Sequence, residues 1–397
     1  MVQVTDLDTF SALLTPEGQA LLAELRDHDP ADELATATRL RRDHPAPLVS
    51  AALGQARLRQ RAAAKFGADA GRMYFTPHGV EQSTRTTVAA HRAARFAALG
   101  VRTLADLCCG IGGDALALAR AGIRVLAVDC DPLACAAARA NAEALGLAEL
   151  IEVRQAEVTE VDTAGYDAVF VDPARRGGAR GGRIFDPEAY SPPLSWAVEA
   201  ARTAPFAALK VAPGVPHEAL PEDAGTEWIS DGGEVKEAVL WFGTEPGARR
   251  ATLLPAGDSL RGAGLPDAEA GPVGRYLYEP DGAVIRAHLV ADVAADVDGR
   301  LLDPTIAYIT ADALRPTPYA TAYELTDVLP FHVKRLKALL RERGVGVAVI
   351  KKRGSAVEPE ELRKKLKLAG GGASVTIFLT RVAGAPTMLL GHPVGGA

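Results

Sequence analysis

Between residues 102 and 242, short runs of apolar residues alternate with longer segments in which apolar residues recur every three or four positions. The short runs are TLADLCC, RVLAVD, LIEVRQ, YDAVFVD and FAALKVA, and their composition is typical of buried strands. The segments between them have helical spacing. Strands that alternate with helices form a mainly parallel sheet, so the pattern predicts an α/β domain over residues 100–245.

The end of this region departs from the alternation. The segment EWISDGGEVKEAVLWF contains two strand-like runs on either side of Asp231-Gly232-Gly233. An acidic residue followed by glycines is typical of a tight turn between two strands. The sequence therefore predicts that an antiparallel hairpin completes the parallel sheet.

The flanking regions have other patterns. Residues 1–99 have apolar residues at helical spacing, and their last helix stops at Gly100, which predicts an N-terminal helical region. Residues 246–320 begin with a stretch rich in Gly, Pro and Ala, which predicts a linker of loose loops followed by accessory strands. Residues 321–397 read as strand, helix, strand, helix, strand and strand, which predicts a small C-terminal α/β module.

Composition indicates a soluble globular protein, with 48% hydrophobic and 24% charged residues in 397. No apolar run approaches the roughly 18–20 residues that span a bilayer, and the first residues lack the pattern of a secretory signal. The cysteines at 108, 109, 130 and 135 resemble neither a disulfide framework nor a spaced metal site. We therefore expect a cytoplasmic protein with no membrane segment and no metal.

The net charge of −6 argues against a nucleic-acid partner, but the charge is unevenly distributed. Residues 331–368 contain twelve Lys or Arg and four Glu, a local balance of +8. The basic residues are Lys334, Arg335, Lys337, Arg341, Arg343, Lys351, Lys352, Arg353, Arg363, Lys364, Lys365 and Lys367. One basic module in an acidic protein indicates a localised anionic partner, although a solvated helix face would have the same composition.

The ends of three predicted strands carry acids. Asp106 precedes a turn with Gly110 and Gly112, where the backbone can approach a ligand, and Asp114 opens the next helix. Asp129 ends the second strand, where a carboxylate meets ribose hydroxyls, and Glu157 follows the third. A dinucleotide site would need a third glycine where this sequence has Ala115. Asp106 could instead bind the amino-acid end of S-adenosylmethionine, and Glu157 the adenine amine.

This arrangement resembles motifs I to III of class I methyltransferases. Their loop has the form acid-x-Gly-x-Gly-x-Gly, which matches at Asp106, Gly110 and Gly112, while Cys108 stands at the first glycine. The resemblance implies a Rossmann-like sheet, which in these enzymes ends in an antiparallel hairpin, and S-adenosylmethionine as the cofactor. Since Cys is small, we expect binding to be retained.

A fourth strand leads into Asp172-Pro173-Ala174-Arg175 at the edge where open α/β sheets bind ligands. Methyltransferases that act on nitrogen have Asp/Asn-Pro-Pro-aromatic at this place. The resemblance implies that Asp172 and Pro173 are catalytic and accept hydrogen bonds from the target amine, but the aromatic residue is absent. A uracil-C5 mechanism is disfavoured, because it needs a cysteine on a later loop and none follows Cys135.

Segments around this motif resemble guanine-N2 methyltransferases of the trimethylguanosine-synthase kind. These segments are Ile184–Pro187 and Tyr190–Pro193 downstream, and Met73–Pro77 upstream. The resemblance implies substrate contacts by Phe75 and Phe185. The arginines of the glycine-rich loop, including Arg175 and Arg176, would suit phosphate contacts.

The whole chain resembles bacterial methyltransferases with a C-terminal THUMP-like domain. Specific parts of the tail are Tyr323–Leu325, Lys351–Gly354 and Phe378–Arg381. THUMP domains bind RNA in tRNA-modifying enzymes, so the resemblance implies an RNA substrate, either tRNA or rRNA. Lys351, Lys352 and Arg353 follow a strand and precede a glycine, so we expect them to meet phosphates at one edge.

Three functions are compatible with these features. The favoured one is an RNA base N-methyltransferase of guanine-N2 type. The second is a methyltransferase for a small molecule or a protein, which the missing aromatic residue favours. The third, a catalytically silent RNA-binding protein, conflicts with the intact acids at positions 106, 129 and 172.

Overall fold

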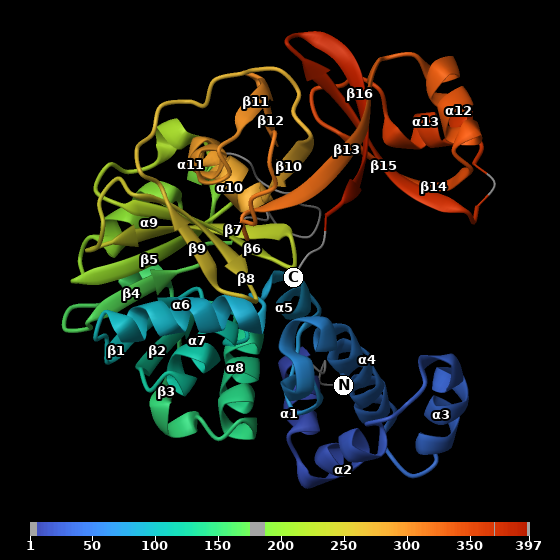
Figure 1. The fold of residues 1–397 in the computed structure, drawn as a ribbon. Coiled ribbons are helices and arrows are strands. Elements are labelled where there is room, and N and C mark those ends of the chain that lie inside the picture. The colour runs from blue at the N-terminus through green and yellow to red at the C-terminus, as the bar shows by residue number, and fades with distance from the viewer. Residues whose placement is uncertain (1–5, 175–186, 369, 395–397) are drawn as a thin grey trace. The chain divides into compact units, whose positions relative to one another are not determined.

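The computed structural model describes residues 6–174, 187–368 and 370–394 (Figure 1). The chain divides into two compact units. One unit contains Met1–Gly225 and Ala238–Gly247, and the other contains Thr226–Glu237 and Ala248–Ala397. The division falls within the predicted hairpin, so the four-part division of the sequence stays a prediction.

The N-terminal region is helical, as predicted. Its helices are α1 (Asp6–Leu13), α2 (Pro16–Glu24), α3 (Glu33–Leu40), α4 (Ala46–Phe66), α5 (Pro77–Gln82) and α6 (Thr86–Ala98). α6 stops before Gly100, whose φ of 80° suits the residue that follows a helix. Phe96 of α6 packs on Trp241 with ring centroids 5.2 Å apart, so this helix is part of the core of the first unit.

The strands predicted between residues 102 and 242 are all present. They are β1 (Thr103–Leu107), β2 (Arg124–Asp129), β3 (Ile151–Gln155), β4 (Ala168–Val171), β5 (Phe206–Val211), β6 (Gly225–Asp231) and β7 (Glu234–Phe242). The helices between them are α7 (Gly113–Arg120), α8 (Pro132–Ala144) and α9 (Leu194–Ala201). β4 is completely buried, which explains its unbroken run of apolar residues.

These strands belong to a sheet of order β3-β2-β1-β4-β5-β7-β6-β8-β9 in the described part of the chain. β1 pairs in parallel with β2 and β4, and β5 pairs in parallel with β4 but antiparallel with β7. The hairpin turn is at Gly232 and Gly233, both with positive φ, as the sequence predicted. The parallel strands therefore bring the ends of β1, β2 and β4 to one edge.

The region predicted to begin with loose loops is more ordered than expected. β8 (Arg249–Leu254) and β9 (Asp258–Arg261) extend the sheet. β10 (Tyr276–Pro280), α10 (Gly282–Arg286), α11 (Val290–Asp296), β11 (Arg300–Asp303) and β12 (Ile306–Ala311) follow. β9 alternates half-buried and exposed residues, so its sequence has no apolar run that marks it as a strand.

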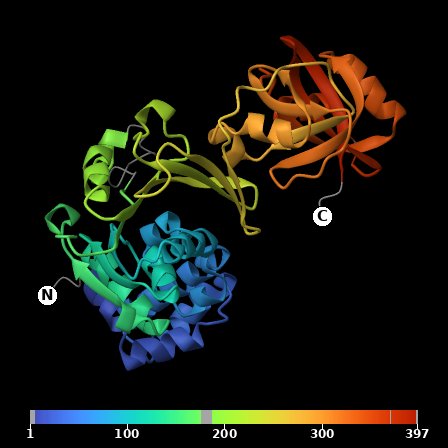
Figure 2. The ribbon, with the colours of Figure 1, turned by 60° about the vertical axis from the view of Figure 1, so that its left-hand side comes forward.

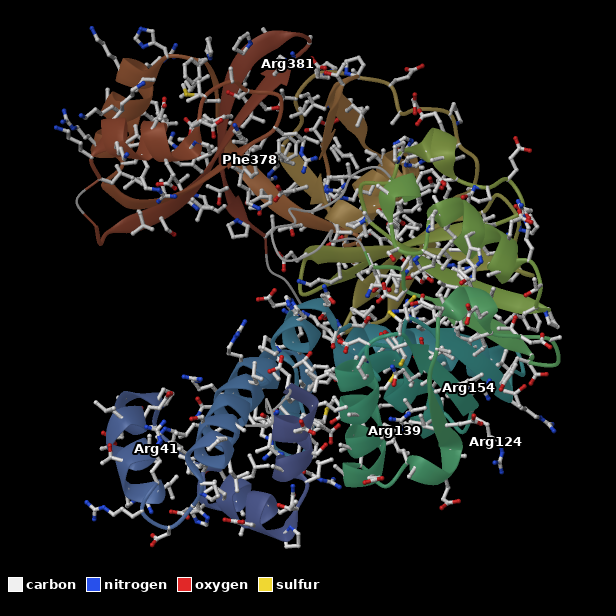
Figure 3. All side chains as sticks on the ribbon, turned by 180° about the vertical axis from the view of Figure 1, so that it is seen from behind. Arg41, Arg124, Arg139, Arg154, Phe378 and Arg381 are labelled. Carbon is white, nitrogen blue, oxygen red and sulfur yellow. The ribbon has the colours of Figure 1, made fainter. Side chains whose placement is uncertain are left out.

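The C-terminal elements occur in the predicted order. They are β13 (Ala320–Pro330), α12 (Val333–Glu342), β14 (Val345–Lys352), α13 (Pro359–Leu366), β15 (Ala373–Val382) and β16 (Ala385–Pro393), shown in orange and red in Figures 1 and 2. Their sheet has the order β11-β12-β10-β13-β16-β15-β14 in the residues described, so the accessory strands join it. Phe378, labelled in Figure 3, is fully buried against Tyr308 and Tyr323.

Candidate active site

Three carboxylates lie where strands of the first unit end. Asp106 is next to last in β1, Asp129 ends β2, and Asp172 directly follows β4. The register places Leu107 beside both Val128 and Val171, so the three positions lie at the same edge. The backbone N–H of Asp172 also donates to the carbonyl of Leu107 at 3.2 Å. The three aspartates thus lie together at the sheet edge that the sequence predicted as the ligand site.

Asp106 is buried without a partner. Its side chain is 1% exposed, and neither carboxylate oxygen has a hydrogen bond within the described residues. Burial, together with the nearby carboxylates of Asp114 and Asp172, raises the pKa of Asp106 well above its ordinary value. A buried, unpartnered carboxylate is costly and therefore rare in folded proteins. The site fits a ligand that brings a cationic hydrogen-bond donor.

The carboxylate of Asp129 holds the glycine loop. Oδ2 accepts a hydrogen bond from the backbone N–H of Gly110 at 2.8 Å, and Oδ1 accepts one from that of Asp131 at 2.9 Å. Burial raises the pKa of Asp129, although these backbone donors act against the shift. Each oxygen keeps a second lone pair, so the carboxylate can still accept hydrogen bonds from a ligand.

The glycine loop also has Cys108 at the position where the methyltransferase motif has its first glycine. Its φ is 68°, in the left-handed region that glycine adopts without strain and a residue with a Cβ does not. Glycine is therefore the usual residue here, and Cys108 carries backbone strain. Burial and the nearby aspartates raise the pKa of the Cys108 thiol well above its ordinary value. Because a thiol is a weak nucleophile, this environment opposes a nucleophilic role.

Asp172 forms an ion pair that the sequence pattern did not predict. Nζ of Lys210 lies 2.7 Å from Oδ2 of Asp172 and donates to Oγ1 of Thr84 at 3.0 Å. Lys210 lies in β5 and is 4% exposed. The signal in the sequence was a single lysine inside the apolar run FAALKVA. A buried lysine in a strand that ends at a ligand edge points to a paired acid.

The structure gives Asp114 a partner inside the protein. Nε of Arg92 donates to its carboxylate at 3.0 Å, and both residues are buried. Burial alone would raise the pKa of Asp114, but Arg92, Lys210 and a hydrogen bond from Thr84 together lower it. The guanidinium of Arg92 also stacks 4.4 Å from the ring centroid of Phe170. Cofactor binding by Asp114 stays a prediction, and its visible role is to join α6 to α7.

Replacing Arg92 by Met is expected to lower the free energy of unfolding by about 3–5 kcal/mol, because it leaves Asp114 buried without its ion pair. The folded-state pKa of Asp114 lies below its ordinary value, so the pair stabilises the fold above that value and the contribution is lost as the pH falls through the folded pKa. Urea unfolding at neutral and acidic pH measures both effects. Equal stability of the variant and the original protein at neutral pH would contradict this interpretation.

The remaining predicted site residues are in different environments. Glu157 is exposed just after β3, near Cys130, and Pro173 is buried beside Asp172. The ring of Phe75 is 2% exposed and packs on Phe66, so the geometry does not support it as a stacking residue. Arg175, Arg176 and Phe185 lie outside the described residues.

The predicted phosphate-binding trio of the C-terminal module is engaged within its own unit. Lys351 forms an ion pair with Glu279, and Lys352 forms one with Glu358. The guanidinium of Arg353 lies 5.2 Å from the ring centroid of Tyr308. Six other basic residues are exposed and have no ion pair with any described residue: Lys334, Arg335, Arg341, Lys364, Lys365 and Lys367. We call these six the helical basic face, because they lie on or just after α12 and α13.

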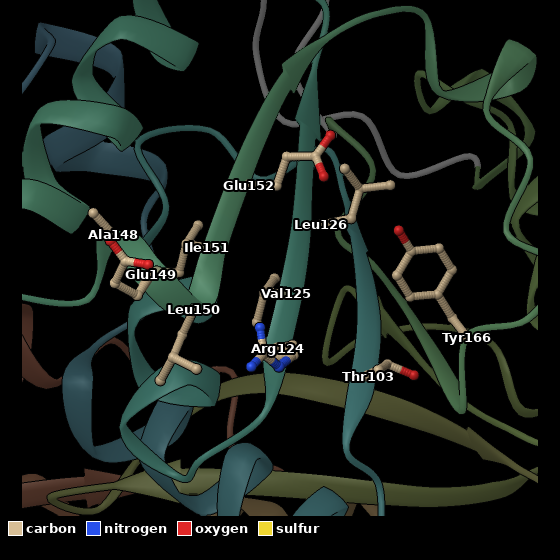
Figure 4. Close-up of a pocket in the computed structure, with 10 residues that line it drawn as sticks. All are labelled: Thr103, Arg124, Val125, Leu126, Ala148, Glu149, Leu150, Ile151, Glu152 and Tyr166. Atoms are coloured by element: carbon tan, nitrogen blue, oxygen red, sulfur yellow. The ribbon is translucent and has the colours of Figure 1, made fainter.

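An open groove of about 420 Å³ lies at the other edge of the first sheet (Figure 4). Thr103, Arg124 and Ile151, which line it, are the first residues of β1, β2 and β3. In an open α/β sheet, ligands bind at the carboxyl ends of the strands. The groove is therefore at the wrong edge to be the site of the three acids. Arg124, which lines the groove, is exposed (Figure 3).

Among the described residues, no group of three or more His, Cys, Asp or Glu side chains could hold a metal ion. In the same described ranges, no helix is both long and apolar enough to cross a membrane.

Family profiles match three parts of the chain. They describe a methyltransferase domain (residues 104–174), a THUMP domain-like domain (residues 320–393) and a domain of unknown function (residues 6–62). Two strains of Mycobacterium tuberculosis have uncharacterized S-adenosylmethionine-dependent methyltransferases that are each 35% identical over 337 residues, 82% of this chain and 90% of theirs. A candidate methyltransferase from Porphyromonas gingivalis W83 shares the fold, with a TM-score of 0.74 at 23% identity over 92% of this chain and 99% of that one.

The fold and the acidic strand edge define an α/β methyltransferase of the Rossmann-like class, as the sequence resemblance implied. The chain belongs to the S-adenosylmethionine-dependent methyltransferases, and S-adenosylmethionine is its cofactor. Its C-terminal module is THUMP-like.

Proposed function

We propose that this methyltransferase modifies a base nitrogen of RNA, with guanine N2 as the favoured type of target. The observation that carries the proposal is the position of Asp172-Pro173 at the strand edge beside Asp106, whose buried, unpartnered carboxylate fits a cationic group of the cofactor. Incubation with labelled S-adenosylmethionine and total RNA, followed by nucleoside analysis, tests it directly. Label in N2-methylguanosine is the expected result.

We assign the cofactor residues from the hydrogen bonds that each carboxylate can accept. The unpartnered carboxylate of Asp106 fits the ammonium group of the methionine end. Asp129 would accept hydrogen bonds from the ribose, and Glu157 from the adenine amine. The loop from Cys108 to Gly112 would lie against the methionine end with its backbone. When bound, S-adenosylmethionine supplies a methyl group on a positively charged sulfur.

The substrate residues mainly orient the acceptor. Asp172 would accept a hydrogen bond from the N–H of the target amine, and the backbone carbonyl of Pro173 would accept a second. These two hydrogen bonds would orient the nitrogen lone pair for the transfer, and alignment supplies much of the rate in a direct transfer. The carboxylate of Asp172 would stabilise the positive charge that develops on the nitrogen, and the proton would then pass from the nitrogen to solvent water.

The RNA part of the proposal is supported by the THUMP-like module and by its exposed charge. THUMP domains of tRNA-modifying enzymes bind RNA, and the helical basic face presents cations with no acidic partner among the residues described. Unpaired cations attract phosphates without first breaking an internal ion pair. We therefore assign the main phosphate contacts to this face instead of Lys351–Arg353, with tRNA or rRNA in the cytoplasm as the partner.

This assignment is tested by two triple variants that remove equal charge. Replacing Lys364, Lys365 and Lys367 by Ala is expected to flatten the log–log salt dependence of RNA affinity by about 2–3, since each phosphate contact contributes about 0.7–0.9. Replacing Lys351, Lys352 and Arg353 by Ala should change the slope by less than about 1, because two of these cations are ion-paired internally. Filter binding from low to high salt measures both slopes.

A larger change of slope in the Lys351, Lys352 and Arg353 variant than in the other variant would indicate that Lys351–Arg353 make the main phosphate contacts. Absence of RNA binding even at low salt would reject the RNA substrate and favour a small molecule or a protein. Affinity for S-adenosylmethionine should be unchanged in both variants, which serves as the control for folding of the first unit.

A further inference from the structure

Lys210 is an unusual residue for its position. It is the fifth residue of β5, its neighbours Leu209 and Val211 are completely buried, and Lys210 itself is 4% exposed. Removing an ammonium group from water is costly unless it is paired and hydrogen-bonded. A lysine kept in the centre of a methyltransferase sheet therefore implies a role that an apolar residue could not fill.

The partners of Lys210 lie on two other segments. Oδ2 of Asp172, just after β4, is 2.7 Å from Nζ, and Oγ1 of Thr84, just before α6, is 3.0 Å from Nζ. Thr84 is buried and its side chain also hydrogen-bonds Asp114 at the start of α7. The ammonium group is thus held by the acceptor-binding acid on one side and by Thr84 on the other, and Thr84 connects it to the helix after the glycine loop.

This arrangement makes the two oxygens of Asp172 different. Oδ2 receives the hydrogen bond from Lys210, while Oδ1 receives none from the described residues. The carboxylate of Asp172 is also partly exposed, unlike that of Asp106. A single held oxygen restricts rotation of the carboxylate and leaves the other oxygen to accept a hydrogen bond.

We propose that Lys210 is a positioning residue for methyl transfer, which orients the carboxylate of Asp172 through Oδ2 so that Oδ1 receives the N–H of the acceptor. The proposal rests on the proposed role of Asp172 and not on the nature of the acceptor. Lys210 contacts neither the acceptor nor the cofactor in this scheme. Thr84 supports it by holding the ammonium group in place.

A double-mutant cycle tests the proposal. Lys210→Met should lower kcat by about 10²-fold, the loss that a misplacement of about 1 Å produces, with the Kd of S-adenosylmethionine and the KM of the acceptor changed less than about three-fold. Asp172→Ala should lower kcat at least as much. If Lys210 acts through Asp172, the kcat of the double variant should be at most about three-fold lower than that of Asp172→Ala.

Lys210→Arg and Thr84→Val separate positioning from a general loss of structure. Arginine keeps the charge and the hydrogen bond, so it should recover at least about ten-fold of the rate lost in Lys210→Met. Thr84→Val should give an intermediate rate, because Lys210 keeps its ion pair. Thermal unfolding identifies any variant that does not fold, and the Arg and Val variants then decide the question.

The outcomes distinguish this inference from the proposed function. If Asp172→Ala retains its rate, the catalytic assignment of Asp172 fails, and the inference fails with it. Suppose that Asp172→Ala is strongly impaired, but adding Lys210→Met lowers its kcat by a further factor as large as in the original protein. In that case, or if Lys210→Arg recovers none of the lost rate, only the inference is overturned. If total RNA takes up no label, the cycle is measured on the protein or small-molecule fraction of a cell extract that does.

Discussion

Asp172→Ala is expected to lower the turnover number by about 10²–10³-fold while the Kd of S-adenosylmethionine stays within about two-fold. The physical reason is that Asp172 has the proposed role of binding the acceptor, whereas the unpartnered carboxylate beside it, Asp106, has the proposed role of binding the cofactor. An interaction that strengthens as charge develops on the acceptor lowers the barrier and leaves binding of the first substrate unaffected.

The measurement is single-turnover methyl transfer at saturating cofactor, combined with calorimetric titration of S-adenosylmethionine. Removing Asp172 also removes its ion pair with the buried Lys210, so some loss of stability is expected as well. Asp172→Asn is the matched control, since it loses the same charge but keeps the volume and one oxygen that can accept the hydrogen bond of Lys210. If turnover of the alanine variant stays within a few-fold of the original, Asp172 has a structural role only.

Asp106→Asn is expected to weaken S-adenosylmethionine binding by about 1.5–3 kcal/mol, roughly 10- to 100-fold, since it removes a buried hydrogen bond between charged groups. The affinity of the original protein should rise as the pH rises through the folded-state pKa of Asp106, because this pKa is raised and the ionised carboxylate would bind the ammonium group. Binding should therefore release protons. The asparagine variant should lose both the pH dependence and the proton release attributable to this residue.

Stability without cofactor gives an independent readout of the same carboxyl. A group whose folded-state pKa is raised stabilises the fold below its unfolded value of about 3.9, and this contribution is lost as the pH rises through the folded-state pKa. Asp106→Asn should thus be as stable as the original protein at neutral pH, or more stable. Calorimetry in buffers of different ionisation enthalpy measures the protons.

Asp129→Ala provides the comparison within the same site. This substitution should weaken S-adenosylmethionine binding by about 1–3 kcal/mol, because the carboxylate also orders the backbone at Gly110 and Asp131. Unlike Asp106, Asp129 has hydrogen-bond partners without the cofactor, so its removal should also reduce stability. Unchanged cofactor binding in a folded Asp106→Asn protein would move the methionine end of the cofactor away from this carboxyl.

Local patterns were sufficient for most elements of the fold. The apolar runs of β1, β2, β4 and β5 predicted strands because these strands are largely buried, where mostly apolar side chains fit. The Gly232-Gly233 pair predicted the hairpin turn because only glycine takes positive φ there without strain. β8 and β9 gave no comparable signal, since short strands near the border of a sheet are partly exposed and gain their hydrogen bonds only from a partner.

The sequence by itself determined the family, the cofactor and the acids at the strand ends, because each depends on a short motif whose spacing sets its own geometry. Only the tertiary structure decided which charged groups have partners. Lys210 meets Asp172 and Lys351 meets Glu279 across long separations in the chain, and Phe75 turned out to be a core residue. The reason is physical: the sequence shows which charged side chains are present, whereas the packing of distant segments decides which of them are paired, buried or left facing a ligand.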